Sequence, residues 1–196
     1  MHGYRCALLV VGFGCACGGA ATREPAPAAP VSPSTGAASP PEAKIKYEFR
    51  VLQTPERQLM AIHDQARGDE LPQKIRGNLD KVWPYLRANR AKTDHNVVVY
   101  RDFDRAAGVM TIDVGVQVEP ALPASGVIVP VTTPGGLVVT TVHLGPYDKL
   151  GDASSALHEF CKTHDHPIAG PTWEEYGDWN DDPNKLRTDV FVLVAR

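Results

Sequence analysis

The chain of 196 residues contains few cysteines and no cluster of basic side chains, and each shortage excludes a class of protein. Of its 4 cysteines only Cys161 follows residue 44, so the later part of the chain holds no disulfide framework. Aspartate and glutamate number 23 against 20 lysines and arginines, which gives a net charge of -3. Because proteins bind phosphate backbones mainly through basic patches, we expect no nucleic-acid partner.

The motifs of common catalytic and metal sites are also missing. The sequence has no HExxH, CxxC or GxSxG motif. His158, His164 and His166 do not have the spacing of a zinc site on a helix, and the polar run 177–183 lacks the closing glutamate of a calcium loop. We therefore predict no metal, no cofactor and no dedicated catalytic residue, and we interpret Cys161 as a small core residue of a helix.

Residues 1–19 have the pattern of an export segment. Arg5 supplies a positive charge, and the apolar stretch Cys6–Phe13 is too short to cross a bilayer as a helix. The run 14–20 resembles the cleavage box of bacterial lipoproteins, with Cys15 as the predicted lipid acceptor and Cys17 as the alternative. We expect an exported protein of the cell envelope or periplasm that contacts a membrane only through this lipid anchor. Plain secretion after cleavage near residue 20 or 21 stays open.

Residues 20–44 predict a disordered linker. They contain six prolines among alanines and serines and no aromatic residue. Such a composition cannot bury enough apolar surface to offset its ordering entropy, and its prolines keep it extended. The remaining residues, 45–196, are the usual length of one domain.

This domain contains the same order of predicted elements twice, with repeat one at about 45–118 and repeat two at about 131–196. In repeat one the predicted elements are strands at 47–52 and 58–63, a helix from about 69 with a kink or an early end at Pro84, and strands at 96–101 and 109–118. In repeat two they are a strand at 137–144, a helix at about 147–164, and strands at 173–176 and 187–195. Two strand–helix–strand–strand units predict an α+β domain whose antiparallel or mixed sheet is backed by two helices, with a ligand cleft between the repeats.

The run Pro171–Tyr176 carries the clearest functional signal. Side chains alternate along a strand, so Glu174 and Tyr176 share one face, and Trp173 and Glu175 share the other. A carboxylate on the inner face of a sheet is unfavourable unless a partner, often a ligand, compensates for its charge. The structural alternative is an exposed pair of Glu174 with Arg187 or Lys185 across a hairpin.

The segments His143–Tyr147, Gly170–Pro183 and Leu186–Val194 resemble the GyrI-like small-molecule-binding domain, which is also the effector-binding half of several bacterial multidrug-responsive transcription activators. The resemblance extends over nearly all of residues 45–196. It implies a central pocket for amphipathic, often cationic or aromatic, molecules, with Glu174 as the pocket glutamate. Glu175 takes this role if the register is shifted by one residue. We find no helix-turn-helix before the domain and expect no activator role.

Such a pocket would use charge and aromatic surface together. Burial raises the pKa of a lone carboxyl group, and an incoming organic cation favours its ionised form, so binding should release protons. The aromatic candidates are Tyr100, Tyr147, Tyr176 and Trp83. Core packing is the competing role of all four and the favoured role of Trp83, and for Tyr100 both roles stay open. His143 precedes the turn 145–147 and is a candidate for the pocket mouth, where it could orient a ligand, with an ordinary strand histidine as the equal alternative.

The predicted function is non-catalytic capture or sensing of a small molecule. The alternative, which the resemblance also allows, is a hydrolase with Glu174 as general acid or base. One stand-alone family member inhibits DNA gyrase, a cytoplasmic target from which export would separate this chain. The sequence does not predict an oligomeric state.

Overall fold

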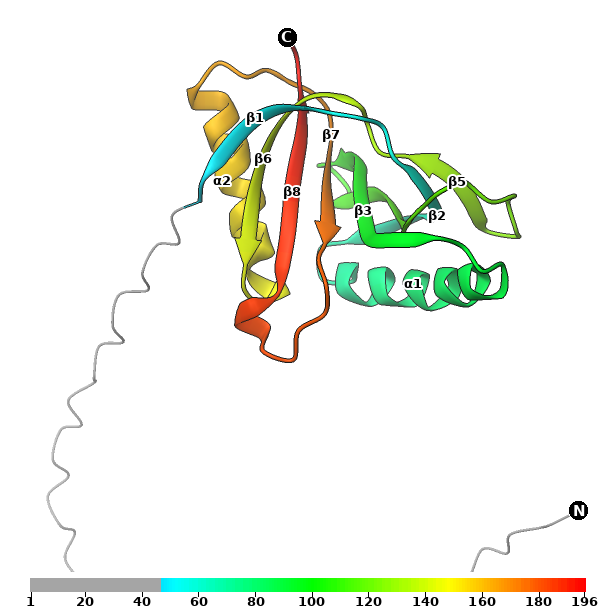
Figure 1. Ribbon diagram of the computed structural model, residues 1–196. Coiled ribbons are helices and arrows are strands. Elements are labelled where there is room, and N and C mark those ends of the chain that lie inside the picture. The colour runs from blue at the N-terminus through cyan, green and yellow to red at the C-terminus, as the bar shows by residue number, and fades with distance from the viewer. Residues whose placement is uncertain (1–46) are drawn as a thin grey trace, which may run out of the picture. The chain divides into compact units, whose positions relative to one another are not determined.

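Residues 47–196 are described by the computed structural model and form eight strands and two α-helices (Figure 1). The elements are β1 (Phe49–Thr54), β2 (Gln58–Arg67), α1 (Leu71–Ala88), β3 (Thr93–Asp104), β4 (Val109–Val118), β5 (Ile128–Thr132), β6 (Gly136–Leu144), α2 (Leu150–Thr163), β7 (Ile168–Tyr176) and β8 (Arg187–Val194), with short 3-10 turns at Tyr147–Lys149 and Pro183–Lys185. The predicted export segment (1–19), the predicted linker (20–44) and the lipidation sites Cys15 and Cys17 lie outside the described residues.

The strands form one sheet in the order β1-β6-β8-β7-β3-β4-β2-β5, and all neighbouring strands are antiparallel. This arrangement confirms the predicted α+β fold, in which two helices back the sheet. One repeat is β2-α1-β3-β4 and the other is β6-α2-β7-β8, and they meet where β3 pairs with β7. The centre of the sheet is therefore also the junction of the two repeats.

The two repeats exchange their leading strands. β1 precedes the first repeat along the chain but pairs with β6 of the second, whereas β5 precedes the second repeat but pairs with β2 of the first. Strand β5 was not predicted from the sequence, because it is short and contains Pro130. Its place at the edge of the sheet, where a proline is tolerated, explains why the strand can form.

The helix boundaries follow their prolines and caps. α1 begins at Leu71 rather than at residue 69, has Pro72 in its first turn as expected, and continues through Pro84 to Ala88. Pro84 removes only one backbone donor, and the residues on either side of it, Val82 and Leu86, are buried, so packing holds the helix together. α2 begins at Leu150, after the 3-10 turn that starts at Tyr147.

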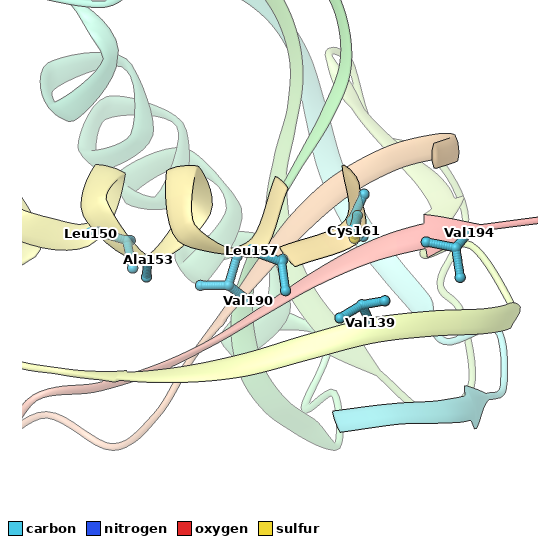
Figure 2. Packing of buried hydrophobic residues seen from close by; sticks show 8 residues of the cluster. Val139, Leu150, Ala153, Leu157, Cys161, Val190 and Val194 are labelled. Carbon is cyan, nitrogen blue, oxygen red and sulfur yellow. The ribbon is translucent and has the colours of Figure 1, made fainter. Parts of the chain in front are cut away.

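The hydrophobic core consists of a layer under each helix and a third layer on the opposite face of the sheet. α2 packs on β6 and β8 through the cluster of buried side chains in Figure 2, which consists of Val139, Leu150, Ala153, Leu157, Cys161, Val190, Val192 and Val194. Burial raises the pKa of the Cys161 thiol, which suits a core residue rather than a nucleophile. α1 packs on the sheet through its buried Val82 and Leu86, which contact Met60, Ile62 and Val116.

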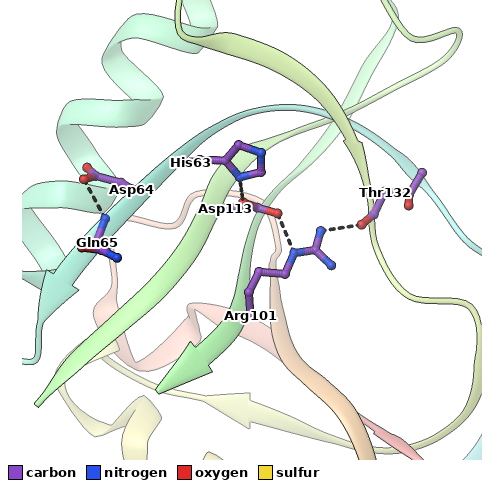
Figure 3. A network of polar contacts seen from close by, with 6 residues as sticks. All are labelled: His63, Asp64, Gln65, Arg101, Asp113 and Thr132. Carbon is purple, nitrogen blue, oxygen red and sulfur yellow. Dashed lines mark hydrogen bonds and ion pairs between the residues drawn. The ribbon is translucent and has the colours of Figure 1, made fainter. Parts of the chain in front are cut away.

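On the face of the sheet away from the helices, Leu59 of β2 and Val138 of β6 belong to one buried cluster although their strands lie near opposite edges of the sheet. The sheet is therefore strongly curled. A polar network connects strands β2, β3, β4 and β5 (Figure 3). Buried Asp113 accepts hydrogen bonds from His63 and from Nε of Arg101 (2.6 Å), and Arg101 also donates to the carbonyl oxygen of Thr132 (2.8 Å).

Candidate binding site

A cavity of about 920 Å³ lies on the helix side of the sheet, where the two repeats meet. Its floor is made by β3 and β7, and its walls are made by α1 and by the first part of α2 with the turn before it. Five of the six residues that the sequence singled out line it, namely Trp83, Tyr100, Tyr147, Glu174 and Tyr176. These residues are far apart in the sequence, and the pairing of β3 with β7 brings them together.

Glu174 is the buried acid of this cavity. Only 4% of its surface is exposed, and its Oε2 atom accepts hydrogen bonds from the hydroxyls of Tyr100 (2.9 Å) and Tyr176 (2.7 Å). No lysine, arginine or histidine in residues 47–196 forms an ion pair with it. Burial raises the pKa of Glu174, and the two hydroxyl donors only partly oppose this effect. Burial next to this carboxyl also raises the pKa of both tyrosines, which therefore stay protonated donors.

The two tyrosines occupy corresponding positions in the two repeats. Val98 of β3 pairs with Glu174 of β7, and two residues further along each strand lie Tyr100 and Tyr176. A pseudo-twofold relation through the Val98–Glu174 pair therefore carries one tyrosine onto the other. Val98, which takes the place of Glu174 in the first repeat, is apolar, so this symmetric frame holds a single carboxylate.

Glu175 and the possible hairpin partners of Glu174 lie elsewhere. Glu175 is not among the cavity residues, and its Oε1 atom accepts a hydrogen bond from Nε1 of Trp173 (3.4 Å) on the opposite face of the sheet. Arg187 pairs with Asp189 (2.7 Å) and Lys185 with Asp182 (3.7 Å), so neither is the partner of Glu174. The alternation of side chains along β7 thus places Glu174, and not its neighbour, at the cavity.

Aromatic side chains form two walls of the cavity. The Tyr147 ring packs edge-on against the Tyr176 ring at a centroid distance of 5.3 Å. Trp83 of α1 donates a hydrogen bond from Nε1 to Oδ1 of Asn96 (3.0 Å), which leaves the apolar surface of the indole as its contribution to the cavity. Burial also raises the pKa of Tyr147, so this ring is neutral at physiological pH.

A family model described as the GyrI-like small molecule binding domain matches residues 47–195. The chain belongs to the GyrI-like family. Residues 47–195 are therefore a small-molecule binding domain, and the cavity between the repeats is its candidate ligand site. No sequence match was found among curated proteins.

Solved structures share the fold of this GyrI-like domain. The EcmrR C-terminal domain is 18% identical, with a TM-score of 0.64, and the similarity covers 76% of this chain and 98% of that one. For EcmrR in its complex with DNA the TM-score is 0.65 at 18% identity over 76% of this chain, which spans only 58% of that longer protein. SAV2435 bound to tetraphenylphosphonium is 15% identical, with a TM-score of 0.54 and coverage of 76% and 94%. At these identities the similarity shows a common fold.

His143 is the predicted site residue that the GyrI-like domain does not bring to the cavity. It is 1% exposed and lies between the hydroxyl of Tyr47, 3.2 Å from Nδ1, and the carbonyl oxygen of Pro146, 3.1 Å from Nε2. Because a carbonyl oxygen can only accept, Nε2 carries the proton and Nδ1 accepts from Tyr47. The expected position at the cavity mouth is therefore wrong, since Tyr47 covers this side of β6. His143 instead supports the turn from which Tyr147 projects.

Several cavity residues of the GyrI-like domain could not be inferred from alternation. Phe103, Ile168 and Trp179 are 53%, 50% and 74% exposed and line the cavity. A bulge at Arg101 shifts the register of β3, so Phe103 pairs with Met110 on the cavity side. Nothing in the sequence marks this bulge, whereas Trp179, a large aromatic residue within a polar turn, was a signal that could have been read.

The described part of the chain has no evident place for a metal or a membrane span. Within residues 47–196, histidine, cysteine and acidic side chains do not gather in groups of three or more that could hold a metal ion. Neither α1 nor α2 is long and apolar enough to cross a bilayer.

Proposed function

We propose that the domain binds amphipathic aromatic cations without transforming them, and that Glu174 supplies the counter-charge. The observation that carries this proposal is a carboxylate that lines the cavity, is 4% exposed and is paired only with two neutral hydroxyl groups. An ionised carboxylate in this position is unfavourable until a positive charge enters the cavity. The free energy of the empty site therefore favours cations over neutral ligands of the same shape.

The surroundings of Glu174 suit a lipophilic cation rather than a small hydrated ion. The α1 wall presents the aliphatic side chains of Leu71, Ile75 and Leu79, and the aromatic rings of Trp83 and Tyr147 also line the cavity. An aromatic face contributes about 0.5–2 kcal/mol to the binding of a cation that contacts it. SAV2435, which shares the fold, was solved with tetraphenylphosphonium, a cation of this class, and this supports the choice of ligand.

The test is calorimetric titration of the wild type and the Glu174→Gln variant with tetraphenylphosphonium and with neutral triphenylphosphine oxide. Loss of a charge-assisted contact should weaken cation binding about 10- to 100-fold and change the affinity for the neutral ligand less than about twofold. Cation binding by the wild type should also release protons, which is seen as a dependence of the measured heat on the ionisation enthalpy of the buffer.

Glu175→Gln is a matched control, because it removes the neighbouring carboxylate on the opposite face of the same strand. This variant should bind both ligands like the wild type. Equal losses of both ligands in Glu174→Gln, or a similar loss of cation binding in Glu175→Gln, would contradict the ion-pair mechanism.

Hydrolysis is the second candidate function, and one observation favours it. The raised pKa of Glu174 lets its carboxyl group hold a proton at a higher pH than an ordinary glutamate, as a general acid must. A hydrolase from Listeria innocua has the same fold, with a TM-score of 0.52 at 12% identity and coverage of 76% and 92%. Mass spectrometry of a ligand recovered after incubation separates the two functions, because binding alone leaves it intact.

We also propose that this binding takes place outside the cytoplasm, at the cell envelope. The support is in the sequence: Arg5, the short apolar stretch Cys6–Phe13 and the following cysteine, Cys15, have the pattern of a lipoprotein export segment. Fractionation of cells that express the full chain or a chain without residues 1–44 tests this location, since only the full chain should be found with the membranes.

A further inference from the structure

A second polar group lies at the rim of the cavity, where α2 meets β7 near Glu174. Nε2 of His158, on α2, is 3.1 Å from Oγ1 of Thr172, on β7, and both residues line the cavity. Thr172 precedes Glu174 by two residues, so the two side chains point to the same face and are separated by about 7 Å along the strand. Tyr100, which donates to Glu174, lies directly opposite Thr172 on β3.

This histidine is a neutral hydrogen-bonding group at physiological pH. Although His158 is exposed at the cavity rim, desolvation of its ring lowers its pKa, so the imidazole is uncharged and does not repel a cation held by Glu174. A neutral imidazole has one N–H donor and one acceptor nitrogen. One ring nitrogen is used by Thr172, and Nδ1 has no hydrogen-bond partner among residues 47–196.

We propose that His158 and Thr172 form a polar subsite that selects organic cations carrying a neutral hydrogen-bonding group, such as a hydroxyl, about 7 Å from the positive charge. This proposal rests on the proposed binding of cations at Glu174 and names the ligand class more narrowly. A simple lipophilic cation fills the cavity and pairs with Glu174. A cation with a hydroxyl group at the right distance also reaches the Thr172 hydroxyl and the imidazole.

The competing role of the His158–Thr172 contact is structural, as a hydrogen bond that ties α2 to β7. The position of the pair favours the ligand. α2 is already held on the sheet by the buried side chains of Leu150, Ala153, Leu157 and Cys161, whereas His158 lies on the cavity side of the helix, at the exposed rim. A structural bond and a ligand subsite predict different results when ligands that differ in one atom are compared.

Two matched probes test the subsite: (4-hydroxymethylphenyl)triphenylphosphonium and its (4-ethylphenyl) analogue, which replaces the hydroxyl oxygen with a carbon. The wild type should bind the hydroxymethyl cation about two- to tenfold more tightly, as one net hydrogen bond allows. In the Thr172→Val and His158→Phe variants this ratio should fall, and in the double variant it should be about one. The affinity for the ethyl cation is the reference in each variant, because a general change in the cavity alters both cations alike and cancels in the ratio.

His164→Phe serves as the control, because it changes another histidine at the end of α2 that does not line the cavity. A ratio of one in the wild type, or an equal loss of both cations in the double variant, would overturn the subsite. Glu174→Gln separates this failure from that of the proposed function. If it weakens the ethyl cation while the wild-type ratio is one, only the subsite is refuted; if the wild type binds neither cation, both proposals fail.

Discussion

At the scale of single residues, the burial of Glu174 is unfavourable for folding but suits the proposed binding of a cation. The group that the empty cavity holds out of water is the group that a cation needs, and the two tyrosine hydroxyls on Oε2 only partly replace the lost hydration. The free protein therefore carries a carboxylate in an unfavourable environment, and the proposed binding of a cation would compensate for its charge. Groups whose pKa is shifted by burial are concentrated at functional sites.

The burial of Glu174 also predicts how stability depends on pH. Burial raises the pKa of Glu174 in the folded state, so between the unfolded and folded pKa values the folded protein holds a proton that the unfolded chain has released. The contribution of Glu174 to the free energy of unfolding is thus present below about pH 4 and is lost as the pH rises through the folded pKa. The Glu174→Gln variant does not titrate and should escape this loss.

Urea unfolding of both proteins from about pH 4 to pH 8 checks this prediction. The free energy of unfolding of Glu174→Gln, minus that of the wild type, should increase with pH by about 1.4 kcal/mol for each unit by which the pKa is raised. Titration of all other groups cancels in the comparison. A difference that stays constant over the whole range would show that the pKa of Glu174 is not raised in the folded protein.

At the scale of secondary-structure elements, the space for an added side-chain atom differs between the strand pair β2–β4 and the helix α1. A Cβ atom on Gly115 of β4 would lie 2.3 Å from the carbonyl oxygen of Met60 and 2.6 Å from Cβ of Ala61, both in the neighbouring strand β2. A Cβ atom on Gly77, inside α1, would meet no atom within 4 Å. The same substitution should therefore have opposite effects in the two elements.

Gly115→Ala should lower the free energy of unfolding by about 3 kcal/mol or more, because backbone atoms would have to move apart. Gly77→Ala should raise it by about 0.5–1 kcal/mol through helix propensity. Urea unfolding monitored by circular dichroism measures both changes. If Gly115→Ala is as stable as the wild type, β2 and β4 do not approach as closely as described.

The elements also show how far the sequence could predict this structure. Hydrophobic periodicity located both helices and most of the strands, since these patterns are local. The alternation Glu174–Tyr176 on one face of β7 holds in the structure for the same reason. Phe103 and His143 could not be placed in this way, because a bulge in β3 and the covering side chain of Tyr47 decide their positions, and both depend on contacts distant in sequence.

At the scale of the whole molecule, the exchange of leading strands makes each repeat depend on the other. β1 pairs with β6 of the second repeat over six residues, from Phe49 to Thr54. Phe49 also stacks on Phe160 of α2, at a ring-centroid distance of 4.5 Å, and Tyr47 donates a hydrogen bond to His143. The first strand of the domain therefore covers the edge of the half that forms the Tyr147 side of the cavity.

This dependence predicts that two N-terminal deletions have different effects. Removal of residues 1–44 leaves every described contact intact, so the shortened chain should fold and should bind tetraphenylphosphonium like the full chain, while losing any association with membranes.

Removal of residues 1–54 takes away β1, exposes the edge of β6 and uncovers Phe160. Loss of the half-buried Phe49, of the Tyr47–His143 hydrogen bond and of the whole β1–β6 pairing together should remove a large part of the stability of a typical domain, which is only about 5–15 kcal/mol. The shorter chain should therefore be unfolded or aggregated by circular dichroism and size-exclusion chromatography. Equal stability of the two shortened chains would mean that the second repeat does not need the strand it receives from the first.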